Sequence, residues 1–369
     1  MQRRTRLVLL FHGIRKRSLE TPPLITVKNK LLFITLLAVG LAFLAVHPSL
    51  GQAENQALPL LRVEGNRFVD DEGASVVLRG VSFSDPDRLE QQGHWNRAYF
   101  EAAKSWGANV VRFPVHPRAW RARGERAYLE LLDQGIAWAA ELKLYVIIDW
   151  HSIGNLRTEL FQHPMYNTTM TETLRFWKTI AARYAGNPVV AFYEVFNEPT
   201  RYNGTLGRMS WEQYKDLIEE IIYVIYAHDR SVIPLVGGFD WAYDLSYVRD
   251  SPIAFPGIAY VAHPYPQKRT PPWEEKWEED FGFVADTYPV FATEFGFMSA
   301  EGRGAHVPVI GDETYGEAII GFFEKKGISW TAWVFDPVWS PQLIENWDFE
   351  PTRQGRFFQN KMKQLNPSH

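Results

Sequence analysis

NVVRFPVHPRAWRARGERAYLELLDQGIAWAAELKLYVIIDWH, residues 109–151, contains two short apolar runs separated by a longer stretch with a helical pattern. The runs at 109–114 and 144–150 are rich in Val and Ile, which favour strands. The stretch 126–142 has the length and the residue types of a helix. A strand, a helix and a second strand in this order are typical of a parallel sheet with helices packed on it.

The same alternation continues along the rest of the chain. Short apolar runs predict eight strands, near residues 77–83, 109–114, 144–150, 190–196, 232–236, 258–263, 289–294 and 329–335. Helical patterns lie near 97–106, 126–142, 171–185, 210–228, 242–249, 276–284 and 314–325, with a last one near 354–365. Eight strands, each followed by a helix, predict an α/β fold of the (β/α)8 TIM barrel type, because doubly wound sheets usually have fewer strands.

A short N-terminal β-hairpin is predicted ahead of the first barrel strand. Residues 61–80 alternate apolar and polar side chains around two turn signals, Gly65-Asn66 and residues 71–73. No linker, repeat or low-complexity segment interrupts the rest of the chain, so residues 54–369 are predicted to form a single domain.

Residues 1–53 have the features of an export signal. The stretch 31–46 is almost wholly apolar, a basic segment precedes it, and small residues suited to a cleavage site follow it. Sixteen residues fall short of the roughly 18 to 20 that span a bilayer, so we favour a cleaved signal, with a retained membrane anchor as the alternative. Either reading places the domain outside the cytoplasm, as a secreted or periplasmic protein or as one anchored to the membrane.

Charge and composition limit the classes of ligand that the protein is expected to bind. The first 53 residues carry eight Lys or Arg and one Glu, whereas the whole chain has a net charge of −4. The rest of the chain is therefore acidic, which argues against nucleic acid as a ligand. The chain has no Cys, which excludes thiolate metal sites and a Cys nucleophile. Fourteen Trp point to flat, uncharged ligands. No cofactor and no protein partner are implied.

Polar and aromatic residues collect where the predicted strands end, which in a TIM barrel is the catalytic face. Six strands contribute to this set: Arg112; Asp149 and His151; Glu194, Asn197 and Glu198; His263 and Tyr265; Glu294; Trp330 and Trp333.

Two of these carboxylates, Glu198 and Glu294, come from opposite sides of the barrel and are expected to face each other. Hydrolysis of a glycosidic bond needs one carboxylic acid to protonate the leaving oxygen and one carboxylate to attack or stabilise the anomeric carbon. We expect Arg112 to keep Glu294 ionised, and we expect Glu198 to stay protonated among aromatic walls that hold no cation. Trp333 would then provide a stacking surface for a sugar ring. Five further tryptophans are candidates for extending a groove: Trp95, Trp120, Trp241, Trp273 and Trp339.

Together the runs VRFP, VIIDWH, FNEP, HPY and FATEFG resemble glycoside hydrolase family 5, the cellulase-like retaining β-glycosidases, over residues 58–366. The resemblance implies a (β/α)8 fold, retention of anomeric configuration and no cofactor. It implies that Glu198 is the acid/base and Glu294 the nucleophile.

The resemblance also implies supporting roles for six residues. Arg112 matches the Arg that bonds the nucleophile, and Tyr265 matches the Tyr whose hydroxyl points at it. His151 matches the His beside the first glycone subsite, and Asn197 the residue that contacts the sugar 2-hydroxyl. In the same way His263 matches the His of the His-x-Tyr pair and Trp333 the platform under the cleaved sugar.

The loops after the first and eighth strands match no subfamily of known specificity, so the substrate stays open. An endo-acting β-1,4-glucanase is the expected activity; a β-mannanase, a β-1,3-glucanase and an exo-acting glucosidase are the alternatives. A metal-dependent hydrolase that uses His151, His263 and Asp149 lacks the usual His cluster. A catalytically silent sugar-binding barrel would have lost a glutamate, and both are present.

Overall fold

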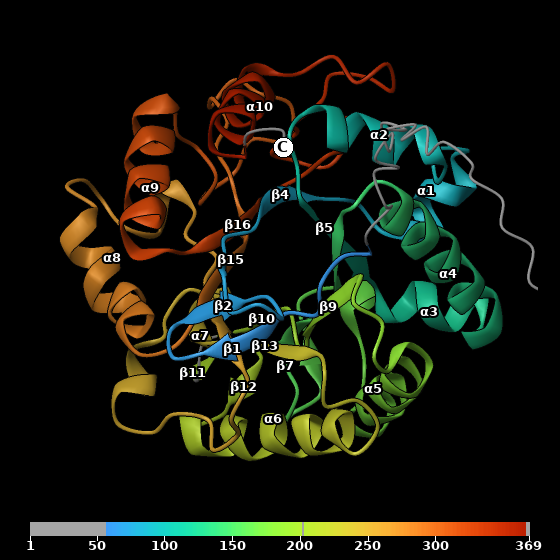
Figure 1. The fold of residues 1–369 in the computed structure, drawn as a ribbon. Helices are drawn as coiled ribbons and strands as arrows, with labels where there is room; N and C mark the ends of the chain where they lie inside the picture. Colours follow the sequence, from blue (N-terminus) through green and yellow to red (C-terminus); the bar gives the residue numbers. More distant parts are fainter. Residues whose placement is uncertain (1–56, 201–202, 367–369) are drawn as a thin grey trace, which may run out of the picture. The chain divides into compact units, whose positions relative to one another are not determined.

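The computed structural model describes residues 57–200 and 203–366, in which eight parallel strands form a closed barrel (Figure 1). Each strand pairs with its neighbour in sequence, and the eighth pairs back to the first. The barrel therefore confirms the predicted fold and all eight predicted strands. These are β4 (Arg79–Ser82), β5 (Val110–Val115), β6 (Tyr145–Trp150), β9 (Val190–Glu194), β13 (Ile233–Gly237), β14 (Ala259–Val261), β15 (Val290–Phe295) and β16 (Ser329–Ala332).

Helices surround the barrel on its outside (Figure 1). They are α1 (Pro86–Gln91), α2 (Arg97–Ser105), α3 (Pro117–Arg123), α4 (Glu125–Glu141), α5 (Met170–Tyr184), α6 (Trp211–Tyr226), α7 (Phe239–Ala242), α8 (Glu274–Asp280), α9 (Glu313–Lys326) and α10 (Arg353–Leu365). The sequence analysis did not predict α1 or α3. The start of α6 is fixed by a capping box, because the Ser210 hydroxyl accepts from the Gln213 N–H and the Gln213 side chain accepts from the Ser210 N–H.

The helix predicted near 242–249 is wrong. After β13 the chain forms α7, in which Asp240, Trp241 and Ala242 have φ of 58°, 60° and 54°, and then only a 3-10 turn, η2 (Ser246–Arg249). Residues in the left-handed region cannot continue a right-handed helix, so no long helix follows the fifth barrel strand. The predicted helix at 276–284 is divided between α8 and the 3-10 helix η4 (Gly282–Asp286).

A small antiparallel sheet lies against the N-terminal end of the barrel. The predicted hairpin is present as β1 (Arg62–Glu64) and β2 (Arg67–Val69), and a third strand, β3 (Ser75–Val76), pairs with β2. The Phe68 ring packs against Phe192 and Phe291 of the barrel, with ring centroids 5.0 and 6.2 Å apart. These contacts join the small sheet to the core inside the barrel.

Short elements cover the opposite end, where the strands finish. They are β7 (Ile153–Asn155), β8 (Leu160–Phe161), η1 (Pro164–Tyr166), β10 (Glu198–Pro199), β11 (Asn203–Gly204), β12 (Gly207–Arg208) and η3 (Pro266–Lys268). Because β10 pairs with β7, Glu198 is aligned with Ile153 and is held in a small sheet rather than in a free loop.

Over residues 57–200 and 203–366, no helix is both long and apolar enough to cross a membrane. The expected export signal or anchor at 1–53, with its apolar stretch 31–46, lies outside the described residues.

Candidate active site

The structure brings all eight predicted site residues to the carboxyl ends of the barrel strands. They are Arg112 within β5, His151 after β6, Asn197 and Glu198 after β9, His263 and Tyr265 after β14, Glu294 within β15 and Trp333 after β16. All eight side chains are buried. The two glutamates keep a small exposed fraction, 7% for Glu198 and 8% for Glu294, whereas Arg112 and His263 have none. The glutamates are therefore the charged groups of this set that a ligand can reach.

Glu294 lies close to Glu198 and holds hydrogen bonds on both of its oxygens. One oxygen of each carboxylate and one nitrogen of His263 lie within 4.8 Å of one another. The Tyr265 hydroxyl donates to Glu294 Oε1 over 2.8 Å, and Arg112 Nη1 donates to Oε2 over 3.5 Å. Burial and the Glu198 carboxylate raise the pKa of Glu294 to about 7, although His263, Arg112 and Tyr265 lower it. Near neutral pH Glu294 is therefore about half protonated, so the expectation that Arg112 keeps this carboxylate ionised is not met.

Arg112 contacts Glu294 as predicted, but its shortest contacts are to other residues. Its Nε and Nη2 donate to the two oxygens of Glu194 over 2.7 and 3.1 Å, and Nη2 also donates to Asn197 Oδ1 over 2.6 Å. Nη2 lies 2.9 Å from Asp149 Oδ2. Burial raises the pKa of Glu194, but Arg112 and His263 outweigh burial and bring it to about 2. The planar guanidinium is therefore the centre of a buried ionic network, and the nucleophile candidate is its most distant partner.

The expectation that no cation lies beside Glu198 is wrong. His263 Nδ1 is 2.9 Å from Glu198 Oε1, and His263 Nε2 is 2.9 Å from the Thr293 hydroxyl. Burial lowers the pKa of His263, but hydrogen bonding to Glu194 and Glu198 raises it to about 9. At neutral pH this imidazole is therefore cationic. The sequence could not show this pairing, because the two side chains come from different strands.

Trp333 and His151 form one wall of the site. The two rings are almost parallel, 6° apart in plane, with centroids separated by 5.5 Å. His151 Nδ1 bonds Asp149 Oδ2 over 2.6 Å, and burial lowers the pKa of His151 well below its usual value, so the ring is neutral. Trp339 continues this wall, because its ring is 20° from parallel to Trp333 at 6.1 Å.

The five candidate groove tryptophans separate into two groups. Trp95 and Trp120 are buried in the core, so the structure does not support them as groove residues. Trp241, Trp273 and Trp339 are half-buried. Trp273 stacks on the buried Trp277 and packs against Tyr315. Trp241 and Trp339 remain as residues that a ligand could contact.

Among the residues that the structure describes, the side-chain amide of Asn197 has a hydrogen bond on its oxygen and none on its nitrogen. Its oxygen accepts from Arg112, and this fixes the amide orientation so that Nδ2 is the donor facing away from Arg112. Within the part of the chain that the structure describes, Nδ2 is buried and has no hydrogen-bond partner. A buried donor in this condition is typical of a group that bonds a ligand hydroxyl.

Sequence reasoning missed Thr293, which bonds His263 and Glu194. It placed Glu194 only at a strand end, and it gave Asp149 a role only as a ligand in the alternative metal site. Neither Thr293 nor these two carboxylates carried a signal that set them apart from capping residues. The alternative metal set of His151, His263 and Asp149 does not assemble as a ligand group. Among the described residues, the group that could hold a metal is instead Glu198, His263 and Glu294.

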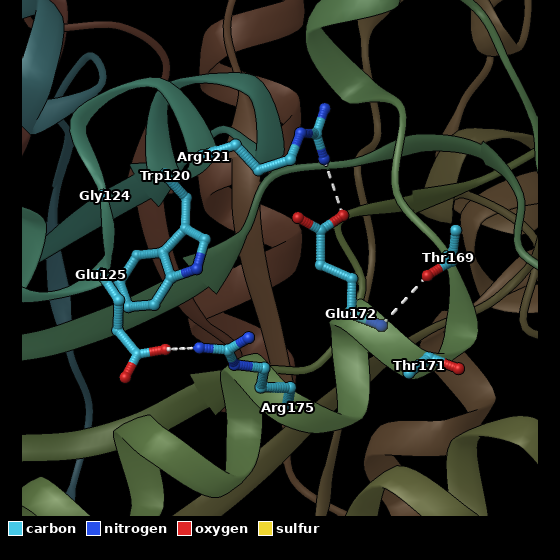
Figure 2. Close-up of a pocket in the computed structure, with 8 residues that line it drawn as sticks. All are labelled: Trp120, Arg121, Gly124, Glu125, Thr169, Thr171, Glu172 and Arg175. Atoms are coloured by element: carbon cyan, nitrogen blue, oxygen red, sulfur yellow. Dashed lines mark hydrogen bonds and ion pairs between the residues drawn. The ribbon is translucent and has the colours of Figure 1, made fainter.

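A cavity of about 520 Å³ lies outside this site, between α3, α4 and the start of α5 (Figure 2). Its charged residues pair with one another, Arg121 with Glu172 and Arg175 with Glu125. None of the eight predicted site residues lines it, so this cavity does not compete with the glutamate pair as the place of chemistry.

Comparison with known proteins shows the family of this chain. Residues 69–338 match the model of the cellulase family, glycosyl hydrolase family 5. The chain belongs to glycosyl hydrolase family 5. Both glutamates and the six other predicted site residues fall within the part that matches the family 5 model, and Trp339 lies one residue beyond it.

Relatives and solved structures of family 5 extend the match. The β-glucanase SdGluc5_26A from Saccharophagus degradans, solved in complex with cellotetraose, is 47% identical, with a TM-score of 0.83 over 84% of this chain and 95% of its own. The catalytic domain of Thermobifida fusca endoglucanase Cel5A, at 23% identity and a TM-score of 0.67 over 82% of this chain and 97% of its own, shows the same fold. Endoglucanase A of Butyrivibrio fibrisolvens is 28% identical over 254 residues, 66% of this chain and 53% of that protein. This chain spans about half the length of such curated relatives.

Proposed function

We propose that this protein is a retaining, endo-acting β-glycoside hydrolase that cleaves β-1,4-glucan by double displacement. The observation that supports the reaction most directly is the spacing of the glutamates, which have carboxylate oxygens within 4.8 Å of each other. Retaining enzymes hold their two carboxyl groups about 5 to 5.5 Å apart, whereas inverting enzymes leave about 6.5 to 9.5 Å for a water molecule.

In the first step Glu294 attacks the anomeric carbon while Glu198 protonates the departing glycosidic oxygen. A bond forms between a Glu294 oxygen and the sugar, and the shortened chain leaves with the proton from Glu198. In the second step Glu198 takes a proton from water, and the resulting hydroxide displaces Glu294 with the β configuration restored. Arg112 and Tyr265 hold the Glu294 carboxylate in place for both steps.

The substrate proposal rests on relatives. A β-glucanase with 47% identity binds cellotetraose, and curated relatives carry the name endoglucanase. Trp333 and Trp339 offer nearly parallel rings on which consecutive sugars of a chain can stack. Asn197 supplies a buried amide donor for a hydroxyl next to the bond that is cleaved.

The experiment measures reducing sugar released by the protein from carboxymethylcellulose, mannan, laminarin and xylan. We expect carboxymethylcellulose to be cleaved fastest and its viscosity to fall before much sugar is released, because an endo-acting enzyme cuts within chains. Preference for mannan or laminarin, or release of sugar with little loss of viscosity, would favour the β-mannanase, β-1,3-glucanase or exo-glucosidase alternatives. Binding without hydrolysis would favour the silent barrel, and loss of activity with a chelator would favour the metal-dependent one.

A second measurement follows the anomeric protons of fresh product by NMR. The β-anomer should form first. Initial formation of the α-anomer would refute the double displacement.

We also propose that residues 1–53 direct the domain out of the cytoplasm. The basic segment followed by the apolar stretch 31–46 supports this. N-terminal sequencing of the exported protein distinguishes a cleaved signal, with a new terminus near residue 54, from a retained anchor.

A further inference from the structure

Glu194 is a buried carboxylate that touches neither solvent nor the two catalytic glutamates. It does contact residues that bond each of those glutamates. Its side chain has no exposed surface. It accepts from Arg112 through two bonds and from the Thr293 hydroxyl over 2.9 Å. Arg112 reaches Glu294 on one side. On the other side Thr293 reaches His263, whose Nε2 also lies 3.5 Å from Glu194 Oε1.

The hydrogen positions in this chain of contacts follow from the donor and acceptor chemistry. An ionised Glu194 only accepts, so the Thr293 hydroxyl must donate its hydrogen to Glu194. The same hydroxyl oxygen is then free to accept, and it accepts from His263 Nε2–H. Nε2 of His263 is therefore protonated in every state, and the nitrogen that gains or loses a proton is Nδ1, which faces Glu198.

This arrangement decides which oxygen of Glu198 carries the catalytic proton. When His263 is cationic, its Nδ1–H donates to Glu198 Oε1 over 2.9 Å. Oε1 is then engaged as an acceptor, so the proton that Glu198 delivers in the proposed first step has to be carried on Oε2. If His263 were neutral, Nδ1 would instead attract that proton to Oε1, away from any leaving oxygen at Oε2.

We propose that Glu194 is a positioning residue for the reaction: through Thr293 it fixes His263 as a donor to Glu198, and through Arg112 it fixes the guanidinium beside Glu294. The inference rests on the proposed function for the roles of the two glutamates. The charged and titratable groups that face Glu194 and His263 are Arg112 from β5, Asp149 and His151 from β6 and its end, Glu198 from β10, Tyr214 from α6 and Glu294 from β15.

Three substitutions in the whole protein separate this role from simple structural support. Glu194→Gln removes the charge and keeps the shape. Thr293→Val removes the hydroxyl that bonds both His263 and Glu194, leaves only the 3.5 Å contact between these two residues, and keeps both Arg112–Glu194 bonds. Asp149→Asn is the matched control, because Asp149 is also buried and also contacts Arg112, but has no bond to His263 or Thr293.

Histidine ring NMR across a pH series measures the protonation of His263, assigned by the signal lost in His263→Gln. In the unchanged protein the midpoint is expected at about 9. We expect Glu194→Gln and Thr293→Val to lower it by about 1 to 2 pH units, the size of one charge-assisted hydrogen bond. Asp149→Asn should leave it unchanged. A midpoint that stays at its original value in Thr293→Val would overturn the proposal, and this variant is informative even if Glu194→Gln does not fold.

The kinetic measurement compares cellotetraose, whose leaving group needs protonation, with an aryl β-cellobioside, whose leaving group does not. Glu194→Gln and Thr293→Val should lower kcat/KM for cellotetraose about tenfold more than for the aryl substrate, because the acid step is affected. Asp149→Asn should lower both equally. Equal losses in all three variants would overturn the proposal. If the unchanged protein cleaves neither substrate, the proposed function has failed instead, while the NMR midpoints still test the Glu194–Thr293–His263 link.

Discussion

Arg112→Lys keeps the positive charge in the buried network but removes the planar fork. Arg112 donates five hydrogen bonds, two to Glu194 and one each to Ser82, Asn197 and Glu294. A lysine ammonium has three donors, so at least two of these bonds are lost. At about 1.5 to 3 kcal/mol for each bond to a charged group, the total loss is about 3 to 6 kcal/mol.

Part of this loss should lower the free energy of unfolding, and the rest should raise the free energy of the transition state for hydrolysis. We expect kcat/KM on carboxymethylcellulose to fall about a hundredfold or more, the size of one lost transition-state contact, and the Tm to fall by several degrees. The lysine keeps the charge but loses the Nη1–H bond to Glu294, whose pKa is about 7, so the acidic limb of the pH–rate profile should also move upward. The assays are kcat/KM from pH 4 to 9 and thermal unfolding. A lower Tm with an unchanged acidic limb and kcat would show that Arg112 only supports the fold.

Three further predictions concern other parts of the molecule. Glu198→Ala should spare the first step on activated aryl glycosides, and added azide should restore turnover with a β-glycosyl azide as the product; a failure of rescue would argue against Glu198 as the acid/base. Glu294→Gln should abolish activity but raise the Tm at pH 8 more than at pH 5. Because the pKa of Glu294 is raised to about 7, ionising this carboxyl destabilises the folded protein as pH rises from 4.5 to about 7, by at most about 3 kcal/mol. An equal rise in Tm at both pH values would contradict this. Ser210→Ala should lower the free energy of unfolding by about 1 kcal/mol, measured by thermal unfolding, and leave kcat/KM unchanged, because it removes only the capping box of α6.

The barrel could be predicted from the sequence because its signals are local. Apolar runs of five to seven residues and the helical stretches between them are visible one segment at a time, and the barrel places every strand end on one face. The helix expected at 242–249 is absent: Ala242, where it would begin, is the last of three left-handed residues that the sequence does not reveal, and the chain then forms only the 3-10 turn η2. None of the three is glycine, the residue that usually indicates this conformation.

The sequence also allowed the site residues to be identified, but it did not show which of them contact each other. Glu198 and Glu294 stand in motifs, so each could be found alone. The contact between His263 and Glu198 depends on the register of four strands and on a threonine that looks like any other strand residue. For the same reason Arg112 was assigned to Glu294, although its two-oxygen contact is with Glu194.

The small sheet of β1 to β3 affects where substrate, product and water can enter and leave the barrel. With Phe68 packed against Phe192 and Phe291, the N-terminal end of the barrel is filled by aromatic rings. The departing chain and the incoming water must then use the same opening, one after the other. In the proposed double displacement, another sugar chain that enters before water does can accept the glycosyl group from the covalent intermediate. At high oligosaccharide concentration this geometry favours transglycosylation, so that products longer than the starting chain accompany the shorter ones.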